Sequence, residues 1–254
     1  TLNQNSPLLE ITTEFDNQVK DHRLRAIFDS GLETDHHFAE SIYEVVKRPN
    51  QVSKRWQNPE NPQRQQAFMN LFDGQEGMTL ANKGLPEYEV LENRYVALTL
   101  IRSVREMGDW GYFPTPEAQC QGKQKLEYGV MFHDAKTRYE SFKIAKSFQI
   151  PFSHVEVRAK NKGAWSPSKQ WLDFESETAM TTSLKMKESS LSPILRFYNM
   201  SNEDVGSFSL NVPNTYEIYR SNLVETKKED LKDDTIKPGE IITILFEKKV
   251  EDMQ

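Results

Sequence analysis

Hydrophobic and polar residues alternate along most of this chain, with the period of two that is typical of β-strands. Within residues 22–28, Leu24, Ala26 and Phe28 fall on one face of an extended strand, while arginines occupy the other face. The same alternation recurs at Leu126, Tyr128, Val130 and Phe132. Pairs such as Asp-Gly and Pro-Gly lie between these runs, so the pattern predicts antiparallel strands joined by turns.

Two segments depart from this alternation. Residues 95–101 are apolar on both faces, which predicts a strand deep inside a layered sandwich. Residues 135–146 place apolar side chains at helical spacing, which predicts one short amphipathic helix that ends before Pro151. The apolar side chains of that helix are Ala135, Tyr139, Phe142 and Ala145.

A polar stretch rich in small residues, 160–169, is the best internal boundary. Several short strands follow it, the last at 241–246, and their number suits a sandwich of immunoglobulin size. We therefore predict an all-β fold with one short helix. A large antiparallel β-sandwich occupies residues 1–159, and a smaller immunoglobulin-sized β-sandwich occupies residues 160–254.

Composition and charge narrow the classes of partner. The chain has 254 residues, a net charge of -6 and a mean hydropathy of -0.71. Nucleic acids and anionic membranes bind basic surfaces, so neither is an expected partner. No stretch approaches the roughly 18 consecutive apolar residues of a membrane span. The single cysteine, Cys120, excludes an internal disulfide and favours a reducing, cytoplasmic location.

No catalytic or metal-binding cluster stands out. Asp35, His36 and His37 are consecutive, but neighbouring side chains on a strand point to opposite faces, so we predict a polar loop instead of a metal site. Cys120 has no second cysteine or histidine nearby. With 38 acidic residues, no carboxylate pair of the glycosidase type can be singled out. The tryptophans are expected to pack in cores or anchor loops, with stacking on a sugar ring as the alternative.

The loop at 108–121 contains the candidate site residues. It joins two apolar strands and holds two glycines and two prolines, which give it an unusual and stiff backbone. We predict that this frame directs Asp109, Trp110, Glu117 and Gln119 outward, toward a sugar or another domain. The alternative is that Glu117 and Gln119 only bond to backbone groups of their own turn.

The same region resembles a known enzyme family. Residues 115–122 (Thr-Pro-Glu-Ala-Gln-Cys-Gln-Gly) follow a Gly-Asp-Trp-Gly loop and precede the alternating strand at 126–133. Further matching segments stand in the same order at 21–25, 43–49 and 77–84. This series resembles the C-terminal half of glycoside hydrolase family 38, the retaining α-mannosidases and mannosylglycerate hydrolases.

The resemblance implies that the chemistry lies outside these residues. Family members carry an N-terminal catalytic domain with a zinc ion held by Asp and His ligands, and with an aspartate nucleophile that forms a glycosyl-enzyme intermediate. The family's His-x-Asp zinc motif is absent, because none of the five histidines has Asp two residues later. We therefore expect no catalytic residue, metal ligand or cofactor in this chain, and zinc in the catalytic domain.

The implied role is support of that domain. The chain would pack on the protein's own N-terminal catalytic domain and lend a loop to the site that hydrolyses an α-mannoside. Two alternatives stay open, a freestanding carbohydrate-binding β-sandwich and a purely structural adhesion module. The residues encoded before Thr1 distinguish them, because a long upstream segment with zinc ligands fits only the first role. The mannoside linkage and the oligomeric state are left open.

Overall fold

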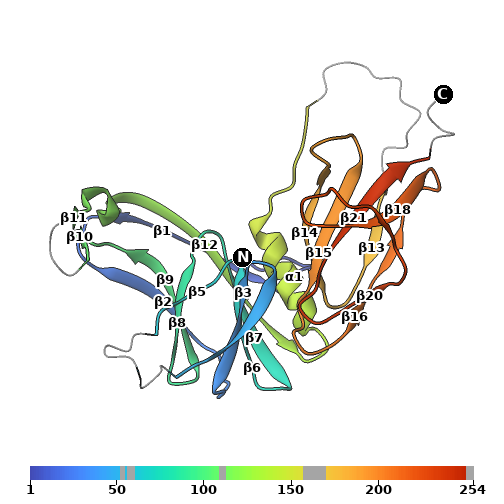
Figure 1. The fold of residues 1–254 in the computed structure, drawn as a ribbon. Coiled ribbons are helices and arrows are strands. Elements are labelled where there is room, and N and C mark those ends of the chain that lie inside the picture. The colour runs from blue at the N-terminus through green and yellow to red at the C-terminus, as the bar shows by residue number, and fades with distance from the viewer. Residues whose placement is uncertain (52–54, 56–60, 109–112, 157–169, 250–254) are drawn as a thin grey trace. The chain divides into compact units, whose positions relative to one another are not determined.

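The structure is a computed structural model, and it describes residues 1–51, 55, 61–108, 113–156 and 170–249. The chain divides into two compact units. The large unit comprises Thr1–Ile42 and Val46–Pro151, and the small unit comprises Tyr43–Val45 and Phe152–Gln254. The predicted boundary between residues 159 and 160 lies outside the described residues. Both units are built of strands, and the described residues contain one α-helix, α1 (Arg138–Gln149) (Figure 1).

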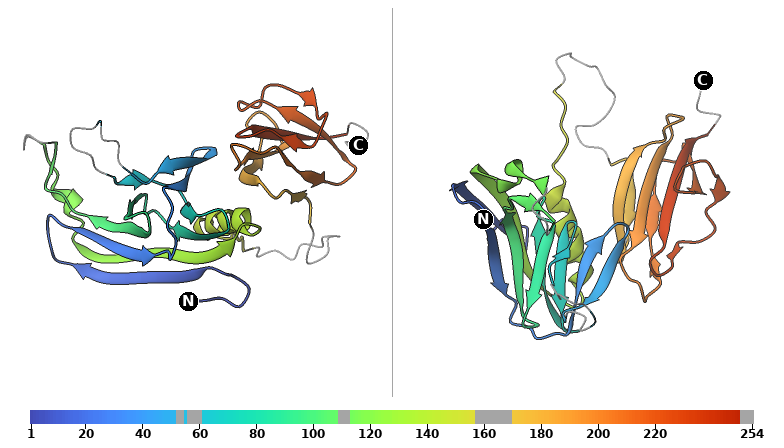
Figure 2. Two further views of the ribbon diagram at one scale, coloured as in Figure 1. Left: turned by 90° about the horizontal axis from the view of Figure 1, so that it is seen from below. Right: turned by 60° about the vertical axis from the view of Figure 1, so that its left-hand side comes forward.

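Two antiparallel sheets form the large unit. One has six strands in the order β1-β12-β7-β6-β3-β4, and the other has four in the order β2-β9-β8-β5. The six are β1 (Leu9–Asn17), β12 (Gly122–Asp134), β7 (Glu76–Asn82), β6 (Phe68–Phe72), β3 (His36–Ser41) and β4 (Glu44–Pro49). The four are β2 (Arg23–Asp29), β9 (Tyr95–Arg102), β8 (Glu87–Leu91) and β5 (Gln63–Arg64). The long strands β1 and β12 run side by side (Figure 2).

The core of the large unit lies between these two sheets. Leu80 of β7 and Leu98 of β9 belong to one buried cluster, so residues of both sheets share it. Leu24, Ala26 and Phe28 pack against the same cluster, which confirms the predicted inward face of β2. Burial of apolar surface on this scale, at about 25 cal/mol per Å², is the main term that holds the two sheets together.

The inward face predicted for β12 is confirmed at three positions and wrong at the fourth. Tyr128 and Val130 are buried, and Leu126 packs against the core. Phe132, however, is 63% exposed. β1 pairs with β12 only as far as Val130. Phe132 therefore extends beyond the end of its neighbouring strand and lies outside the apolar cover that the sandwich provides.

α1 covers the second face of the six-stranded sheet, through contacts with β6, β7 and β12. The ring of Phe142 stacks on that of Phe68, with centroids 4.5 Å apart. The hydroxyls of Ser141 and Thr79 lie 2.8 Å apart in the same contact. Strand β7 is consequently buried on both faces.

The observed helix is shifted from its predicted range of 135–146. Asp134 accepts hydrogen bonds from the backbone N–H and the hydroxyl of Thr137, at 2.8 and 2.7 Å. These bonds close a turn before the helix begins at Arg138. At the other end the helix continues to Gln149. Proline disfavours a helical conformation at the residue before it, so Pro151 restricts Ile150 and the helix ends just before that residue.

The small unit is a second antiparallel sandwich. Its main sheet has the order β14-β15-β21-β18-β19, and β13 pairs with β17 while β16 pairs with β20. The strands are β13 (Asp173–Glu175), β14 (Ala179–Met186), β15 (Pro193–Asn199), β16 (Gly206–Ser207), β17 (Ser209–Asn211), β18 (Tyr216–Ser221), β19 (Glu229–Asp230), β20 (Thr235–Ile236) and β21 (Ile241–Lys248). With two sandwiches and one helix, the structure confirms the predicted fold class.

A separate core holds the small unit together. Phe197 and Ile244 of the main sheet share it with Phe208 from the opposing layer. Trp171 packs edge-on against the rings of Tyr216 and Phe246, with each pair of centroids 5.3 Å apart. This tryptophan therefore has the core role that the sequence analysis expected for it.

Candidate functional site

The candidate loop forms a short hairpin at one end of the large unit. Its strands are β10 (Glu106–Met107) and β11 (Phe113–Pro114), and the 3-10 helix η1 (Pro116–Gln119) follows them. Asp109 and Trp110, two of the predicted site residues, lie outside the described residues. The hairpin closes because the N–H of Thr115 donates to the carbonyl of Arg105 at 2.8 Å.

Gln119 does not point outward as predicted. Its side chain is buried, and its Nε2 donates to Oδ1 of Asp21 while its Oε1 accepts the backbone N–H of Asp21, both at 2.9 Å. Asp21 has a φ of +52°. A left-handed residue of this kind lies in a tight turn, and one amide side chain satisfies both its side chain and its N–H. Gln119 is therefore a structural joint between η1 and the β1–β2 turn.

Two further side chains, those of Asn17 and Ser103, complete this joint, and neither was predicted from the sequence. Asn17 Nδ2 donates to the carbonyl of Gln119 at 3.2 Å and to that of Cys120 at 2.8 Å. The hydroxyl of Ser103 donates to the carbonyl of Gln119 at 2.8 Å. The hydrogen bonds fix the base of the hairpin to the end of β1, about 100 residues earlier, and to Ser103, which directly follows β9. No local sequence signal points to Asn17, because its partners lie about 100 residues away.

The outer side of the hairpin has a mixed character. Glu117 is exposed in the first turn of η1. Met107 is 67% exposed and Phe113 is 58% exposed, one on each hairpin strand. A carboxylate beside large apolar side chains suits contact with another protein surface or with a sugar.

The most prominent carboxylates on the sheets are held by arginines. Glu87 and Glu89 lie on one face of β8, and Nη2 of Arg23 is 2.8 Å from Glu87 Oε1. Desolvation acts to raise the pKa of Glu87, but hydrogen bonds from Thr99 and Arg102 and the charge of Arg23 outweigh it, so its pKa lies below its usual value. A carboxyl that is ionised in this way does not serve as a general acid near neutral pH.

His37 is buried in a polar network, although a polar loop was predicted here. It lies on β3, with Nδ1 2.6 Å from Asn50 Oδ1 and Nε2 2.7 Å from the hydroxyl of Tyr88. Desolvation lowers the pKa of His37 to about 4, despite the hydrogen bond to Asn50. Burial likewise raises the pKa of Tyr88 to about 12. The prediction of a loop was wrong because these residues form β3, and the alternation of the strand directs His37 into the interior. There its imidazole bonds to Asn50 and Tyr88.

Metal chemistry finds no support in this part of the protein. Within the described ranges, no group of three or more His, Cys, Asp or Glu side chains could hold a metal ion. The ligand candidates are engaged elsewhere, since His37 faces Asn50 and Nε2 of His133 lies 2.8 Å from Asn70 Nδ2. The described residues therefore offer no such ligand set, and the zinc ion that the resemblance implies belongs to the catalytic domain, outside this chain. In the same ranges, no helix has the length and the apolar character that crossing a membrane requires.

Family models match both units of the chain. The model for the glycosyl hydrolases family 38 C-terminal domain matches residues 1–111. The model for the glycosyl hydrolases family 38 C-terminal beta sandwich domain matches residues 178–244.

Individual relatives give the same result. A protein described as "Putative mannosylglycerate hydrolase" from Halalkalibacterium halodurans is 34% identical, over 97% of this chain and 28% of its own length. An α-mannosidase from Enterococcus faecalis V583 aligns with a TM-score of 0.84 and 40% identity, over 97% of this chain and 28% of that chain. A glycosyl hydrolase family 38 protein from Enterococcus faecalis aligns with a TM-score of 0.81 and 37% identity. The alignment covers 97% of this chain and 29% of that chain.

The chain thus spans less than a third of the length of these relatives. The chain belongs to glycosyl hydrolase family 38, of which it represents the C-terminal β-sandwich region.

Proposed function

We propose that this chain is the non-catalytic C-terminal part of a retaining α-mannosidase and that it completes a catalytic domain of the same protein. One observation carries the proposal. Almost the whole chain aligns with an α-mannosidase, at a TM-score of 0.84, yet it accounts for only 28% of that enzyme. The remaining length is ample for a catalytic domain, which would also contain the zinc ion.

The hairpin is the surface through which the chain would serve that domain. Glu117, Met107 and Phe113 are exposed there, while Gln119 holds the hairpin base in place. A rigid base below an exposed mixed surface suits the positioning of a neighbouring domain or of a sugar hydroxyl. Asp109 and Trp110, which lie outside the described residues, stay predicted site residues of the same loop. The lone cysteine supports a cytoplasmic location for the enzyme.

The freestanding carbohydrate-binding module is less well supported. Such modules stack sugar rings on exposed aromatic faces. Trp171, the tryptophan that the structure describes in the small unit, instead packs against Tyr216 and Phe246.

We expect the 254-residue chain by itself to fold but not to hydrolyse an aryl α-mannoside, with or without added zinc. Among its described residues, no group of three or more His, Cys, Asp or Glu side chains could hold a metal ion. A longer protein that includes the sequence encoded before Thr1 should hydrolyse the same substrate and should lose activity with a chelator.

Steady-state release of the aryl group from both proteins checks this prediction. Zinc-dependent turnover by the chain alone would contradict it. An upstream reading frame with no His-x-Asp segment would equally exclude a family 38 catalytic domain.

A further inference from the structure

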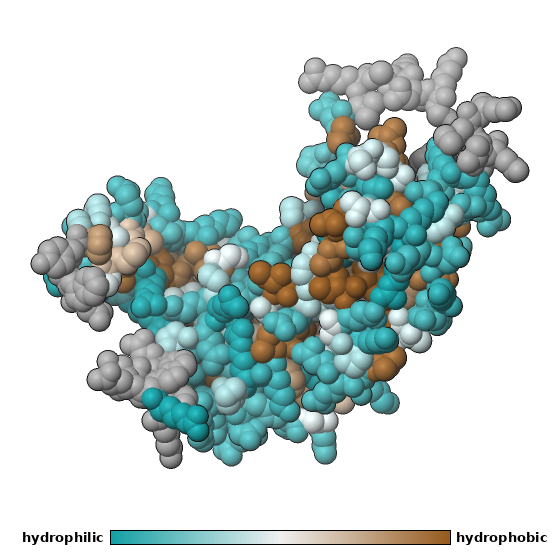
Figure 3. Space-filling view, in the orientation of Figure 1, coloured by the Kyte–Doolittle hydropathy of each residue, from teal (hydrophilic) through white to brown (hydrophobic). Residues whose placement is uncertain are grey.

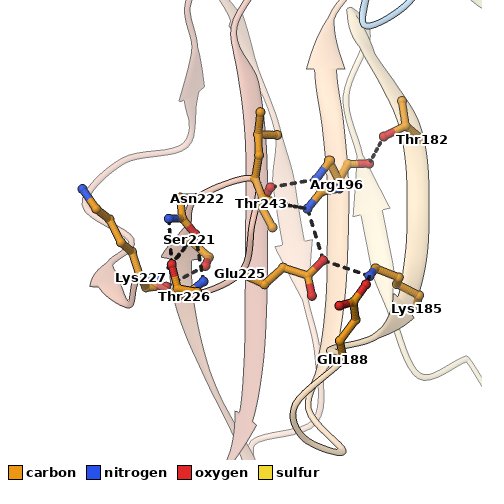
Figure 4. Close-up of polar contacts among 11 residues, drawn as sticks. Thr182, Lys185, Glu188, Arg196, Ser221, Asn222, Glu225, Thr226, Lys227 and Thr243 are labelled. Atoms are coloured by element: carbon orange, nitrogen blue, oxygen red, sulfur yellow. Dashed lines mark hydrogen bonds and ion pairs between the residues drawn. The ribbon is translucent and has the colours of Figure 1, made fainter.

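A polar cavity with a volume of about 650 Å³ opens on the small unit. It lies between the β14–β15 turn and the segment at 223–226, which crosses the sheet beside it (Figure 4). The residues that decide its chemistry are Lys185, Lys187, Glu188, Arg196, Leu223 and Glu225. The proposed mannosidase function does not use this cavity.

Arg196 forms the floor of the cavity and is only 8% exposed. Its Nε donates to the hydroxyl of Thr243 at 3.0 Å, and its Nη2 donates to the carbonyl of Leu223 at 2.7 Å and to Glu225 Oε1 at 3.3 Å. These three bonds fix the plane of the guanidinium group. Among the described residues, no hydrogen bond uses Nη1, so its two N–H groups are available to a ligand.

Glu225 forms a rigid wall beside this arginine. Its carboxylate is buried, and Oε1 also lies 3.0 Å from Nζ of Lys185. Desolvation acts to raise the pKa of Glu225, but the hydrogen bond from Lys185 and the charges of Lys185 and Arg196 outweigh it and hold the pKa below its usual value. Glu225 is therefore ionised near neutral pH, and its negative charge is already shared by two cations.

The backbone around Glu225 is held in an unusual conformation. Glu225 has a φ of +61°, which a non-glycine residue adopts only when its surroundings require it. Asn222 provides part of that requirement, since its Oδ1 accepts the backbone N–H of Thr226 at 2.8 Å and that of Lys227 at 3.3 Å. Because this turn is fixed, the wall of the cavity is formed before any ligand binds.

The side chains that line the cavity have a net positive charge, which one negative charge on a ligand would neutralise. Its lining has three cationic side chains (Lys185, Lys187 and Arg196) and two anionic ones (Glu188 and Glu225), an excess of one positive charge. This excess stands out because the whole chain has a net charge of -6. The exposed side chains of Leu223 and Val224 add an apolar rim.

We propose that this cavity binds a small organic carboxylate. The carboxylate group would accept hydrogen bonds from Nη1 of Arg196 and from the ammonium group of Lys187, and a short aliphatic body would lie against Leu223 and Val224. Arginine is suited to this contact because its planar donors match the two oxygens of a carboxylate. A dianion such as phosphate fits less well, because the cavity has a single excess positive charge.

The test is a titration of the 254-residue chain with isovalerate, followed by NMR on the Nε–Hε signal of Arg196. Its neutral isostere, isovaleramide, and inorganic phosphate are titrated in parallel. We expect a saturable shift with isovalerate that weakens at high salt, no saturable shift with isovaleramide, and weaker binding of phosphate. No saturable shift with isovalerate, equal binding of the amide or tighter binding of phosphate would each overturn the proposal.

A matched pair of variants separates the cavity from the general charge of the protein. Lys187→Ala removes one lining cation and none of the bonds between Arg196 and Glu225, and it should weaken isovalerate binding about threefold. Lys232→Ala removes an exposed lysine that does not line the cavity, and it should leave binding unchanged. Equal effects of both variants would contradict the site. Arg196→Ala is less informative, because it also leaves Glu225 buried without that partner.

Discussion

Several buried polar side chains in this protein, among them His37 and Gln119, bond to specific partners. His37 shows how far such matching determines a protonation state. Asn50 Nδ2 donates to the carbonyl of Thr34, so its Oδ1 is free to accept a hydrogen bond from Nδ1 of His37. Nε2 of His37 then accepts from the hydroxyl of Tyr88. An added proton on Nε2 would remove that acceptor and would place a buried charge near Arg48.

The depressed pKa of His37 predicts a specific loss of stability in acid. Its folded-state pKa is about 4, below the usual 6.5, so the unfolded state binds the proton more readily. The stability from the neutral imidazole is complete above pH 6.5 and is lost as the pH falls from 6.5 toward 4, by up to about 3 kcal/mol.

Urea unfolding of the wild type and of His37→Gln across this pH range checks the effect. The difference between them in free energy of unfolding should shrink as the pH falls, because the variant has no imidazole to protonate there. His154→Gln, which changes an exposed histidine, is the control and should follow the wild type. A constant difference between His37→Gln and wild type at all pH values would show that His37 is not the titrating group.

At the scale of elements, the helix and the hairpin depend on contacts with strands that are distant in sequence. α1 has one strongly buried ring, that of Phe142, which stacks on Phe68 of β6. The helix is also anchored by Lys146, whose Nζ lies 2.9 Å from the buried carboxylate of Glu40 on β3. The hairpin is anchored through Gln119 and Asp21.

Phe142→Ala should lower the free energy of unfolding of the large unit by about 3–5 kcal/mol, because it leaves a cavity between α1 and the sheet. Chemical denaturation measures the change. Ser147→Ala, at an exposed position of the same helix, is the matched control and should have little effect. A loss below 1 kcal/mol for Phe142→Ala would mean that the helix contributes little to the stability of the sheet.

Gln119 and Glu117, the two predicted site residues that lie in η1, should respond differently to substitution. Gln119→Leu leaves the Asp21 N–H without its acceptor and should cost about 1–3 kcal/mol of stability in this chain. Glu117→Ala changes an exposed side chain and should leave the melting temperature nearly unchanged.

In the longer protein, Glu117→Ala and Asp109→Ala should each lower kcat/KM for an α-mannoside about tenfold, or about 1.4 kcal/mol of transition-state stabilisation. Thermal melting and steady-state kinetics make this comparison. If Glu117→Ala melts early and leaves kcat/KM unchanged, the exposed side of the hairpin has no role in the site.

At the scale of the whole molecule, each of the two units has a hydrophobic core among its described residues. One lies between the sheets of the large unit, and the other lies in the small unit around Phe197 and Ile244. The face seen in Figure 3 is mostly hydrophilic, with hydrophobic residues gathered in smaller areas. This surface accounts for the low mean hydropathy without any shortage of buried apolar residues.

Because each unit has its own core, a substitution that leaves a cavity in one core should destabilise that unit and not the other. Phe197→Ala should speed hydrogen exchange of the amides in β15 and β21 by removing about 3–5 kcal/mol of protection from the small unit. The amides of β7 and β9 should keep their wild-type rates. Exchange measured by mass spectrometry distinguishes the outcomes, and a uniform acceleration in all four strands would show that the units unfold together.

The sequence by itself determined which side of most strands faces a core and where the helix lies. Leu24, Ala26 and Phe28 were placed correctly because the face of a strand follows from the alternation of its own residues. The helix around Phe142 was found from its local 3.6-residue spacing. The family likewise followed from the order of short segments such as residues 115–122 and 21–25. Family-model matches over residues 1–111 and 178–244 confirm the family.

Only the tertiary structure decided which distant residues meet. Gln119 and Asp21 are 98 residues apart, so nothing beside Gln119 in the sequence showed that its amide has a buried partner. His37 became a core residue because Asn50, which follows β4, and Tyr88 on β8 meet its imidazole. Phe132 became exposed because β1 ends its pairing at Val130. Periodicity records the side on which a residue lies. Whether a side chain is buried, ionised or exposed to solvent also depends on strand register and on the residues that pack against it. Register and packing each involve two segments of the chain, so neither can be read from one segment alone.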